Sequence, residues 1–231
     1  MKNRDLLYAV CNEIRPILNR LVLVGGCATE LLVTDKAAPL PRPTQDVDMV
    51  VEVVNLADYY QLENQLRSLD FTQTEDDHGV ICRWTKGFMK LDLMPTDRAI
   101  LGFSNSWYPE VVSHALQTNL RDISLKHISS ALFIATKLEA FTHRGNNDFR
   151  MSHDIEDLVA VVDGRATIVE DISAAPQTVK AFVCDEFKRY LSIEDFEDAL
   201  PCHLPPDSAS QFRLGILITR IQAIIDLEKV W

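Results

Sequence analysis

The chain has 231 residues, enough for one large domain or for a core domain with an appendage. Hydrophobic residues make up 47% and charged residues 25%, an ordinary globular mixture, and no apolar run is long enough to span a membrane. The formal net charge of −11 argues against a broad basic face for nucleic acid. No secretory signal opens the chain, and its 5 cysteines lack regular spacing, so we expect a cytoplasmic protein with reduced thiols and no membrane contact.

The first part of the chain alternates helical and strand patterns. Helical spacing of apolar residues predicts a helix over residues 4–19, and the all-apolar run 21–24 predicts a buried strand. That run stops at Gly25-Gly26, which indicates a tight turn. A loop with three prolines follows over residues 34–43, and the β-branched stretch 46–54 predicts the next strand.

A second helix and two further strand pairs follow. Asn55 can cap a helix that runs to residue 69, because the apolar residues of this segment fall on one side. Residues 79–84 and 88–94 predict a hairpin whose turn is Thr85-Lys86-Gly87. Residues 118–128 predict a short strand pair, so we expect these strands to build a mixed sheet.

Beyond residue 128 the pattern becomes helical. A serine at 129 or 130 begins a helix that runs to about residue 143, and Ser152 caps another helix that Gly164 ends. The remaining segments also have helical periodicity. The sequence therefore predicts an α+β (mixed α/β) protein with a core domain over residues 1–128 and a helical domain over residues 129–231.

Three carboxylates are the most informative feature of the predicted sheet. Asp46 and Asp48 open one strand and point to the same side, because alternate residues of a strand share a face. Asp92 lies between Leu91 and Leu93, where a carboxylate is costly unless it is paired or bound to metal. Converging carboxylates repel one another, and two Mg²⁺ ions would relieve that repulsion. Such a pair of metals promotes in-line displacement at phosphorus.

Each of these pieces also has an ordinary explanation. Asp46 and Asp48 fit a solvated strand end, Asp92 fits the open face of an edge strand, and Gly25-Gly26 fits a simple turn. Together, in this order and in these strand contexts, they match the nucleotidyltransferase pattern.

The resemblance extends to one branch of that superfamily. The stretches that carry it are LVGGCATELL, TQDVDMVVEV, KLDLMPTD, ATKLEAFTHRGNNDF and SHDIEDLVAVVDGR. They resemble abortive-infection nucleotidyltransferases of the AbiEii/AbiGii type, which include toxins of type IV toxin–antitoxin systems. The similarity covers roughly residues 20–165.

The resemblance implies a DNA-polymerase-β-like nucleotidyltransferase core, with the helical C-terminal domain completing the nucleotide cleft. It also implies Mg²⁺-dependent transfer of a nucleotide from an NTP to an acceptor hydroxyl, with tRNA as the acceptor in relatives and an antitoxin protein as a partner.

The resemblance further assigns roles to single residues. Gly25 and Gly26 would contact the triphosphate, and Asp46 and Asp48 would bind metal. Asp92 would be the third metal ligand and the base. Lys137 matches the family's phosphate-contacting lysine, and Asp154 matches the aspartate of its later motif.

The chain departs from the family pattern next to the Gly-Gly turn. Cys27 stands where the family usually has Ser or Thr, and a thiol is a poorer hydrogen-bond donor to phosphate than a hydroxyl. The 20 residues from Gly26 to Asp46 also form a long, Pro-rich connection.

Lys137 and Asp154 have alternatives that need no ligand. Lys137 flanks the apolar face of its helix, where a lysine can extend its charged end to solvent. Asp154 lies in the first turn of a helix, where the helix dipole favours an acid. Arg144 is either a second cation for the nucleotide or a partner for the helix C-terminus.

Two other functions stay open beside tRNA modification. One is a small-molecule nucleotidyltransferase of the aminoglycoside-modifying kind, and the other is a catalytically weak module that binds a nucleotide or a partner. Residues 150–231 carry 15 acidic and 8 basic residues, a net −7 that disfavours contact with RNA. An RNA acceptor would need a positive strip from the N-terminal part. The candidate cations for that strip are Arg42, Arg83, Lys86 and Lys90.

Overall fold

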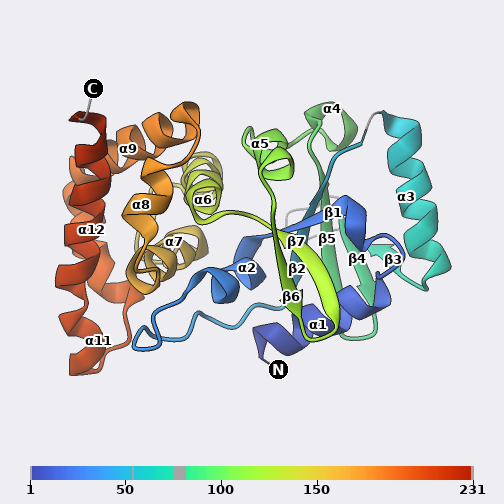
Figure 1. Ribbon diagram of the computed structural model, residues 1–231, viewed down its shortest axis with the longest axis horizontal. Coiled ribbons are helices and arrows are strands. Elements are labelled where there is room, and N and C mark those ends of the chain that lie inside the picture. The colour runs from blue at the N-terminus through green and yellow to red at the C-terminus, as the bar shows by residue number, and fades with distance from the viewer. Residues whose placement is uncertain (1, 54, 75–81, 230–231) are drawn as a thin grey trace. The chain divides into compact units, whose positions relative to one another are not determined.

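The computed structural model describes residues 2–53, 55–74 and 82–229 (Figure 1). The chain forms two compact units. The first comprises Met1–Glu30 and Arg42–Ser129, and the second comprises Leu31–Pro41 and Ser130–Trp231. The first unit holds the sheet and the second is helical, so the predicted α+β class is confirmed.

A seven-stranded mixed sheet, counted over the described residues, forms the centre of the first unit in the order β3-β4-β5-β2-β1-β7-β6. The strands are β1 (Leu21–Val24), β2 (Val47–Val51), β3 (Thr72–Thr74), β4 (Arg83–Lys86), β5 (Met89–Pro95), β6 (Leu116–Leu120) and β7 (Ile123–His127). Strand β1 pairs in antiparallel with β2 and in parallel with β7, while β2 pairs in parallel with β5. All four residues of β1 are buried, as expected for an apolar strand in the middle of a sheet.

Two predicted strands differ from the observed ones. Strand β2 is shorter than the predicted 46–54, of which residue 54 lies outside the described residues. The predicted hairpin turn is wrong: β4 and β5 are joined by Gly87-Phe88 alone, because Gly87 adopts a φ of +59° that suits a two-residue turn. Residues 79–81 of the predicted first hairpin strand lie outside the described residues.

The first unit contains the helices predicted near residues 4 and 55 and further short helices, most of which the sequence did not predict. They are α1 (Asn3–Glu13), η1 (Leu18–Arg20), α2 (Gly25–Leu32, which runs on into the second unit), α3 (Leu56–Ser68), α4 (Arg98–Leu101) and α5 (Tyr108–Ser113). The predicted helix over 4–19 is wrong in its second half. Pro16 has no backbone N–H and disfavours helical geometry at Arg15, so α1 ends at Glu13. Asn55 caps α3, as predicted, by accepting a hydrogen bond of 3.0 Å from the Asp58 N–H.

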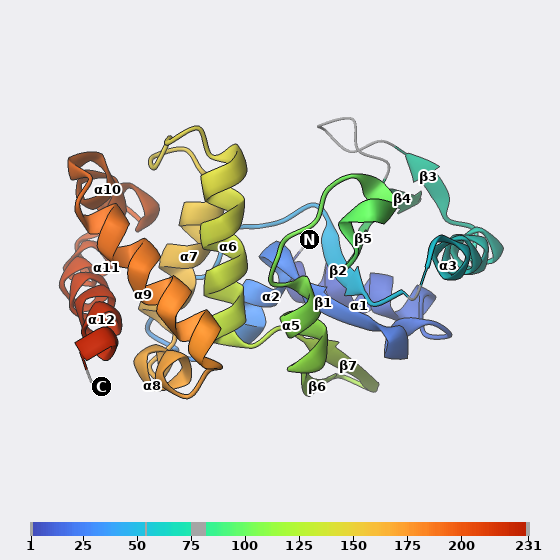
Figure 2. The same ribbon diagram turned by 90° about the horizontal axis from the view of Figure 1, so that it is seen from above.

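Four longer helices pack together in the second unit (Figure 2). They are α6 (Ser130–Arg144), α7 (His153–Gly164), α9 (Gln177–Leu191) and α12 (Leu214–Asp226). Shorter helices complete the unit: α8 (Ile168–Ser173), α10 (Glu194–Ala199), η2 (Leu200–His203), α11 (Ser208–Phe212) and η3 (Leu227–Lys229). Ser152 caps α7 as predicted, because its hydroxyl accepts hydrogen bonds from the Asp154 and Ile155 N–H groups. Within the described ranges, no helix is both long and apolar enough to cross a bilayer.

The segment Leu31–Pro41 belongs with the helical unit, whereas the sequence division placed it in the 1–128 domain. The Gly164 carbonyl accepts hydrogen bonds from the Thr34 and Asp35 N–H groups, each at 2.9 Å. The Asp35 carboxylate forms an ion pair of 2.7 Å with Arg213 on the helical side. These contacts fix the segment to the end of α7.

Candidate active site

One row of paired residues crosses four neighbouring strands of the sheet. Val24 on β1 pairs with Asp48 on β2, Asp48 pairs with Asp92 on β5, and Asp92 pairs with Arg83 on β4. Directly paired residues of neighbouring strands point to the same face, so the two carboxylates and the guanidinium share one face. Asp46 precedes β2, and its carboxylate reaches the same face, since it contacts Arg83.

Arg83 joins two of the three carboxylates. Its Nε donates to Asp92 Oδ1 at 2.8 Å and its Nη2 donates to Asp92 Oδ2 at 2.7 Å, which is a bidentate pair. The same Nη2 lies 2.9 Å from Asp46 Oδ2. Since both Oδ2 atoms contact one nitrogen, they are less than about 6 Å apart. Asp46 and Asp92 therefore converge, with the guanidinium between them.

Asp48 lies against Gly25, where α2 begins directly after β1 in place of the separate tight turn that the sequence predicts. Gly25 has a φ of +62°, a left-handed conformation that side-chain-bearing residues rarely adopt. A Cβ at this position would stand 1.9 Å from Asp48 Oδ2. Both observations require glycine here, and they place the Asp48 carboxylate next to the start of α2.

The second glycine faces the loop that precedes β2. A Cβ at Gly26 would lie 3.4 Å from Thr44 Oγ1 and 3.5 Å from Arg42 Nη2. The buried Asn3 side chain holds this loop, since its Nδ2 donates to the Arg42 carbonyl at 2.9 Å and its Oδ1 accepts from the Thr44 N–H at 3.0 Å. Thr44 Oγ1 donates in turn to Asp46 Oδ1 at 2.8 Å. The loop thus brings a cation to Gly26 and orients Asp46.

Cys27 has a structural contact in this loop. Its Sγ lies 3.4 Å from the Asp46 carbonyl oxygen, and the side chain is buried. Burial, and then the charges of Asp48 and Asp46, raise the pKa of the Cys27 thiol. The neutral thiol can donate to the Asp46 carbonyl and so helps fix the residue before β2.

The donor set suits magnesium in its chemistry, because Mg²⁺ prefers carboxylate oxygens, phosphate oxygens and water. As the side chains stand, no group of three or more His, Cys, Asp and Glu in the described residues is arranged to hold a metal ion. Arg83 accounts for part of this, because its guanidinium lies between Asp46 and Asp92. A metal would have to replace that contact.

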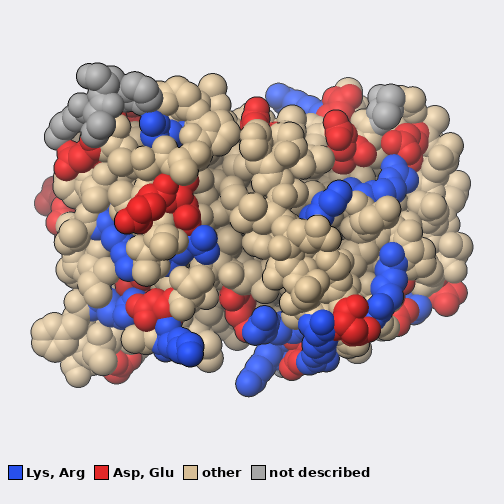
Figure 3. All heavy atoms as spheres, in the orientation of Figure 1, with Lys and Arg blue, Asp and Glu red and all other residues tan. Residues whose placement is uncertain are grey.

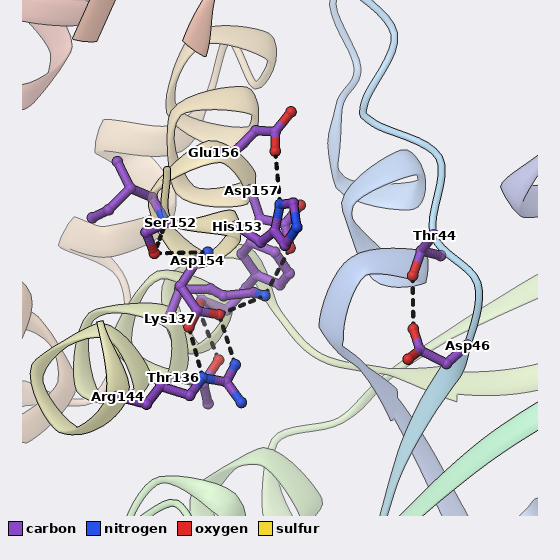
Figure 4. A network of polar contacts seen from close by, with 12 residues as sticks. Thr44, Asp46, Thr136, Lys137, Arg144, Ser152, His153, Asp154, Glu156 and Asp157 are labelled. Atoms are coloured by element: carbon purple, nitrogen blue, oxygen red, sulfur yellow. Dashed lines mark hydrogen bonds and ion pairs between the residues drawn. The ribbon is translucent and has the colours of Figure 1, made fainter. Parts of the chain in front are cut away.

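The predicted nucleotide residues Lys137 and Asp154 contact each other in the second unit (Figure 4). Lys137 Nζ, on α6, lies 3.1 Å from Asp154 Oδ1 and 2.7 Å from Asp157 Oδ2, both on α7. Arg144 donates two hydrogen bonds of 2.9 Å to the Asp154 carboxylate. Burial alone would raise the pKa of Asp154, but the Lys137 and Arg144 charges outweigh it and hold that pKa well below its usual value.

Arg83 is the site residue that the sequence did not identify. The sequence offered it only as one cation of a positive strip for RNA, whereas its side chain is only 9% exposed and pairs with two carboxylates. The cause is the misplaced turn. Had Gly87-Phe88 been chosen as the turn, the hairpin register would have set Arg83 opposite Asp92.

Comparisons with known proteins support the fold. No family model matches the chain, and no curated protein matches its sequence. A nucleotidyltransferase-like antigenic protein from Paracoccidioides brasiliensis is similar in structure, with a TM-score of 0.50 and 16% identity over 86% of this chain and 93% of that one. A candidate nucleotidyltransferase from H. pylori gives a TM-score of 0.49 and 13% identity over 99% and 96% of the two chains. The first similarity shows a nucleotidyltransferase-like fold.

Proposed function

We propose that the protein is a magnesium-dependent nucleotidyltransferase of the AbiEii/AbiGii type that moves a nucleotide from an NTP to an acceptor hydroxyl. One observation carries the proposal. Asp46 and Asp92 share Arg83, and Asp48 pairs with Asp92 and lies against Gly25, on a fold that is nucleotidyltransferase-like. Phosphoryl chemistry of this kind depends on positioning and electrostatics, which such a cluster supplies.

In this proposal the residues of the first unit have separate roles in binding phosphate, binding metal and accepting a proton. The phosphates lie over Gly25-Gly26, where backbone N–H groups at the start of α2 favour an anion and Arg42 adds positive charge. Asp46, Asp48 and Asp92 would hold the magnesium ions, which offset the negative charge of the phosphates. Asp92 takes the proton of the acceptor hydroxyl.

The proposed roles of the second-unit residues and of the partners rest on the resemblance to the AbiEii/AbiGii type. Lys137 and Asp154 stay predicted nucleotide-binding residues. We propose tRNA as the acceptor, an antitoxin protein as a partner, and the cytoplasm as the location. The net −7 of residues 150–231 favours a small cationic acceptor instead.

A second candidate function follows from the ion pairs of Arg83. A fold that keeps the carboxylates but holds two of them on an internal guanidinium also suits a module that binds a nucleotide or a partner without efficient transfer. Binding of an NTP with no transfer to any acceptor would favour this candidate.

The direct test is transfer of label from each of the four NTPs to total RNA in the presence of Mg²⁺. We expect label in a small RNA fraction, and we expect Asp92→Asn to reduce transfer by about 100-fold or more while the protein still melts cooperatively. The matched control is Asp122→Asn, which changes an exposed aspartate of the same unit. Wild-type transfer by Asp92→Asn would remove Asp92 from the mechanism.

A further inference from the structure

The ion pairs of Arg83 carry an inference that rests on the proposed function. We propose that Arg83 is an internal cation that competes with divalent metal for Asp46 and Asp92. In the metal-free protein it holds the two carboxylates together, and metal binding requires the guanidinium to release at least Asp46. Arg83 therefore sets the metal affinity of the site as a positioning residue.

The competition follows from shared oxygens. Nη2 of Arg83 contacts Oδ2 of Asp46 at 2.9 Å and Oδ2 of Asp92 at 2.7 Å. An ion that bridged these carboxylates would approach the same region with ligand distances of ~2.1 Å. A guanidinium and a divalent cation cannot occupy that region together, because they would overlap and repel.

The two carboxylates are held unequally. Asp92 receives two hydrogen bonds from Arg83, and both side chains are only 9% exposed. Asp46 receives one from Nη2, its side chain is 27% exposed, and it precedes β2 rather than lying within it. The Arg83–Asp46 contact is therefore the side that opens first, while the bidentate pair with Asp92 keeps the guanidinium close by.

The arrangement also explains why a cation is present at all. Asp48 is the cross-strand neighbour of Asp92, and Asp46 shares Arg83 with Asp92, so each of the other two carboxylates is linked to Asp92. Carboxylates so close repel unless a positive charge lies among them. Arg83 supplies that charge from the strand next to Asp92. It keeps the carboxylates in position in the metal-free protein, but it weakens metal binding because the ion must displace it.

The test measures Mn²⁺ binding to the full-length protein without nucleotide, from the free Mn²⁺ signal in electron paramagnetic resonance. We expect Arg83→Gln to bind Mn²⁺ about tenfold more tightly than wild type, because the ion no longer displaces a charged hydrogen-bonding partner. Its melting temperature should be lower than that of wild type without metal and should rise more on adding Mn²⁺. Adding Asp46→Asn to Arg83→Gln should abolish the gain.

The matched control is Lys86→Gln, which removes one cation from the same strand and should bind Mn²⁺ as wild type does. If Arg83→Gln does not fold, Arg83→Lys is the deciding variant. Its ammonium cannot reproduce the bidentate contact, so this variant should also bind Mn²⁺ more tightly than wild type, by a smaller factor. Affinity unchanged or reduced in the Arg83 variant that folds would overturn the proposal.

Nucleotide transfer, assayed in parallel, separates this inference from the proposed function. Tighter Mn²⁺ binding by Arg83→Gln with no transfer by wild type supports the inference and counts against the enzyme. Transfer by wild type with no gain in Mn²⁺ affinity overturns the inference and leaves the enzyme standing.

Discussion

Each unit contains a cluster of ion pairs, and the two clusters differ in how charges are shared. The sheet cluster consists of Arg83, Asp46 and Asp92. The helix cluster consists of Lys137, Arg144, Asp154 and Asp157. Among the residues that the structure describes, the guanidinium of Arg83 pairs with two carboxylates in the sheet cluster, and the Asp46 carboxylate is partly open to solvent. In the helix cluster, within the described part of the chain, the buried Lys137 and the 60% exposed Arg144 contact two carboxylates. The Asp154 and Asp157 side chains are only 7% and 1% exposed. A cation shared with a partly open carboxylate suits exchange for another cation, whereas carboxylates that are both buried suit stability.

Among the substitutions that test the difference between the two clusters, removal of Lys137 should have the largest effect. Lys137→Ala leaves two buried carboxylates without their ammonium partner, so we expect the free energy of unfolding to fall by about 3–5 kcal/mol. Urea unfolding at pH 7 measures this. The control is Lys188→Ala, whose exposed ion pair with Glu228 should matter little. Stability close to wild type together with lost NTP binding would instead make Lys137 a nucleotide contact, as the family resemblance predicts.

The next largest effect should come from the glycine under Asp48. Gly25→Ala combines a positive φ with a Cβ placed 1.9 Å from Asp48 Oδ2, so the carboxylate and its strand must shift. We expect a loss of about 2–3 kcal/mol in the free energy of unfolding and a large loss of transfer. Gly87→Ala is the matched control, because Gly87 has a similar φ of +59° with nothing within 4 Å of its Cβ position. It should cost only about 1 kcal/mol. Equal losses in the two variants would mean that contact with Asp48 does not matter.

Local features of the fold were predictable because their causes lie within a few residues. The strand β1 is a purely apolar run, and the caps Asn55 and Ser152 satisfy N–H groups two or three residues away. The order of the strands was not predictable, because it depends on pairings between distant segments such as β1 with β7.

The same distinction applies to the candidate site. Alternation along the predicted strand 46–54 placed Asp46 and Asp48 on one face without reference to the rest of the chain, although the observed β2 begins at Val47. The position of Arg83 depends on the hairpin register, and an error in the turn alters every cross-strand pair. The partners of Lys137 lie on another helix, 17 and 20 residues further along the chain, and its helical pattern alone did not indicate them.

The helix cluster should also give a pH signature. The pKa of Asp154 is lowered in the folded protein, so its stabilising contribution is fully present above its unfolded value of about 3.9 and is lost as the pH falls further. We expect Asp154→Asn to be less stable than wild type by about 1–3 kcal/mol at pH 7, with a smaller difference below pH 4. Urea unfolding across this range measures the effect. Asp185→Asn, which changes an exposed aspartate of α9, is the control and should cost little stability at pH 7. A pH-independent difference for Asp154→Asn would contradict the pairing.

The acceptor itself is tested through the surface cations, whose single effects should be the smallest. On the face drawn in Figure 3, basic side chains are interspersed with acidic ones. With Arg83 buried among carboxylates, the predicted positive strip depends on Arg42, Lys86 and Lys90. Lys86 is partly neutralised, because its Nζ lies 2.7 Å from a Glu13 carboxylate oxygen.

The corresponding variant is Lys86→Gln with Lys90→Gln. If tRNA binds here, the slope of log affinity against log salt should flatten by at most about two charges, and by less if the ion pair with Glu13 persists in the complex. The matched variant is Lys126→Gln, which changes a lysine of β7 whose Nζ donates to the Asn19 carbonyl, and it should leave the slope unchanged. Filter binding of labelled tRNA from low to moderate salt measures the slope. A protein whose acceptor is a small cation would bind tRNA weakly, and neither variant would then change the slope. That result would favour the small-molecule enzyme, since net −7 over residues 150–231 attracts a cation as readily as it repels a phosphate backbone.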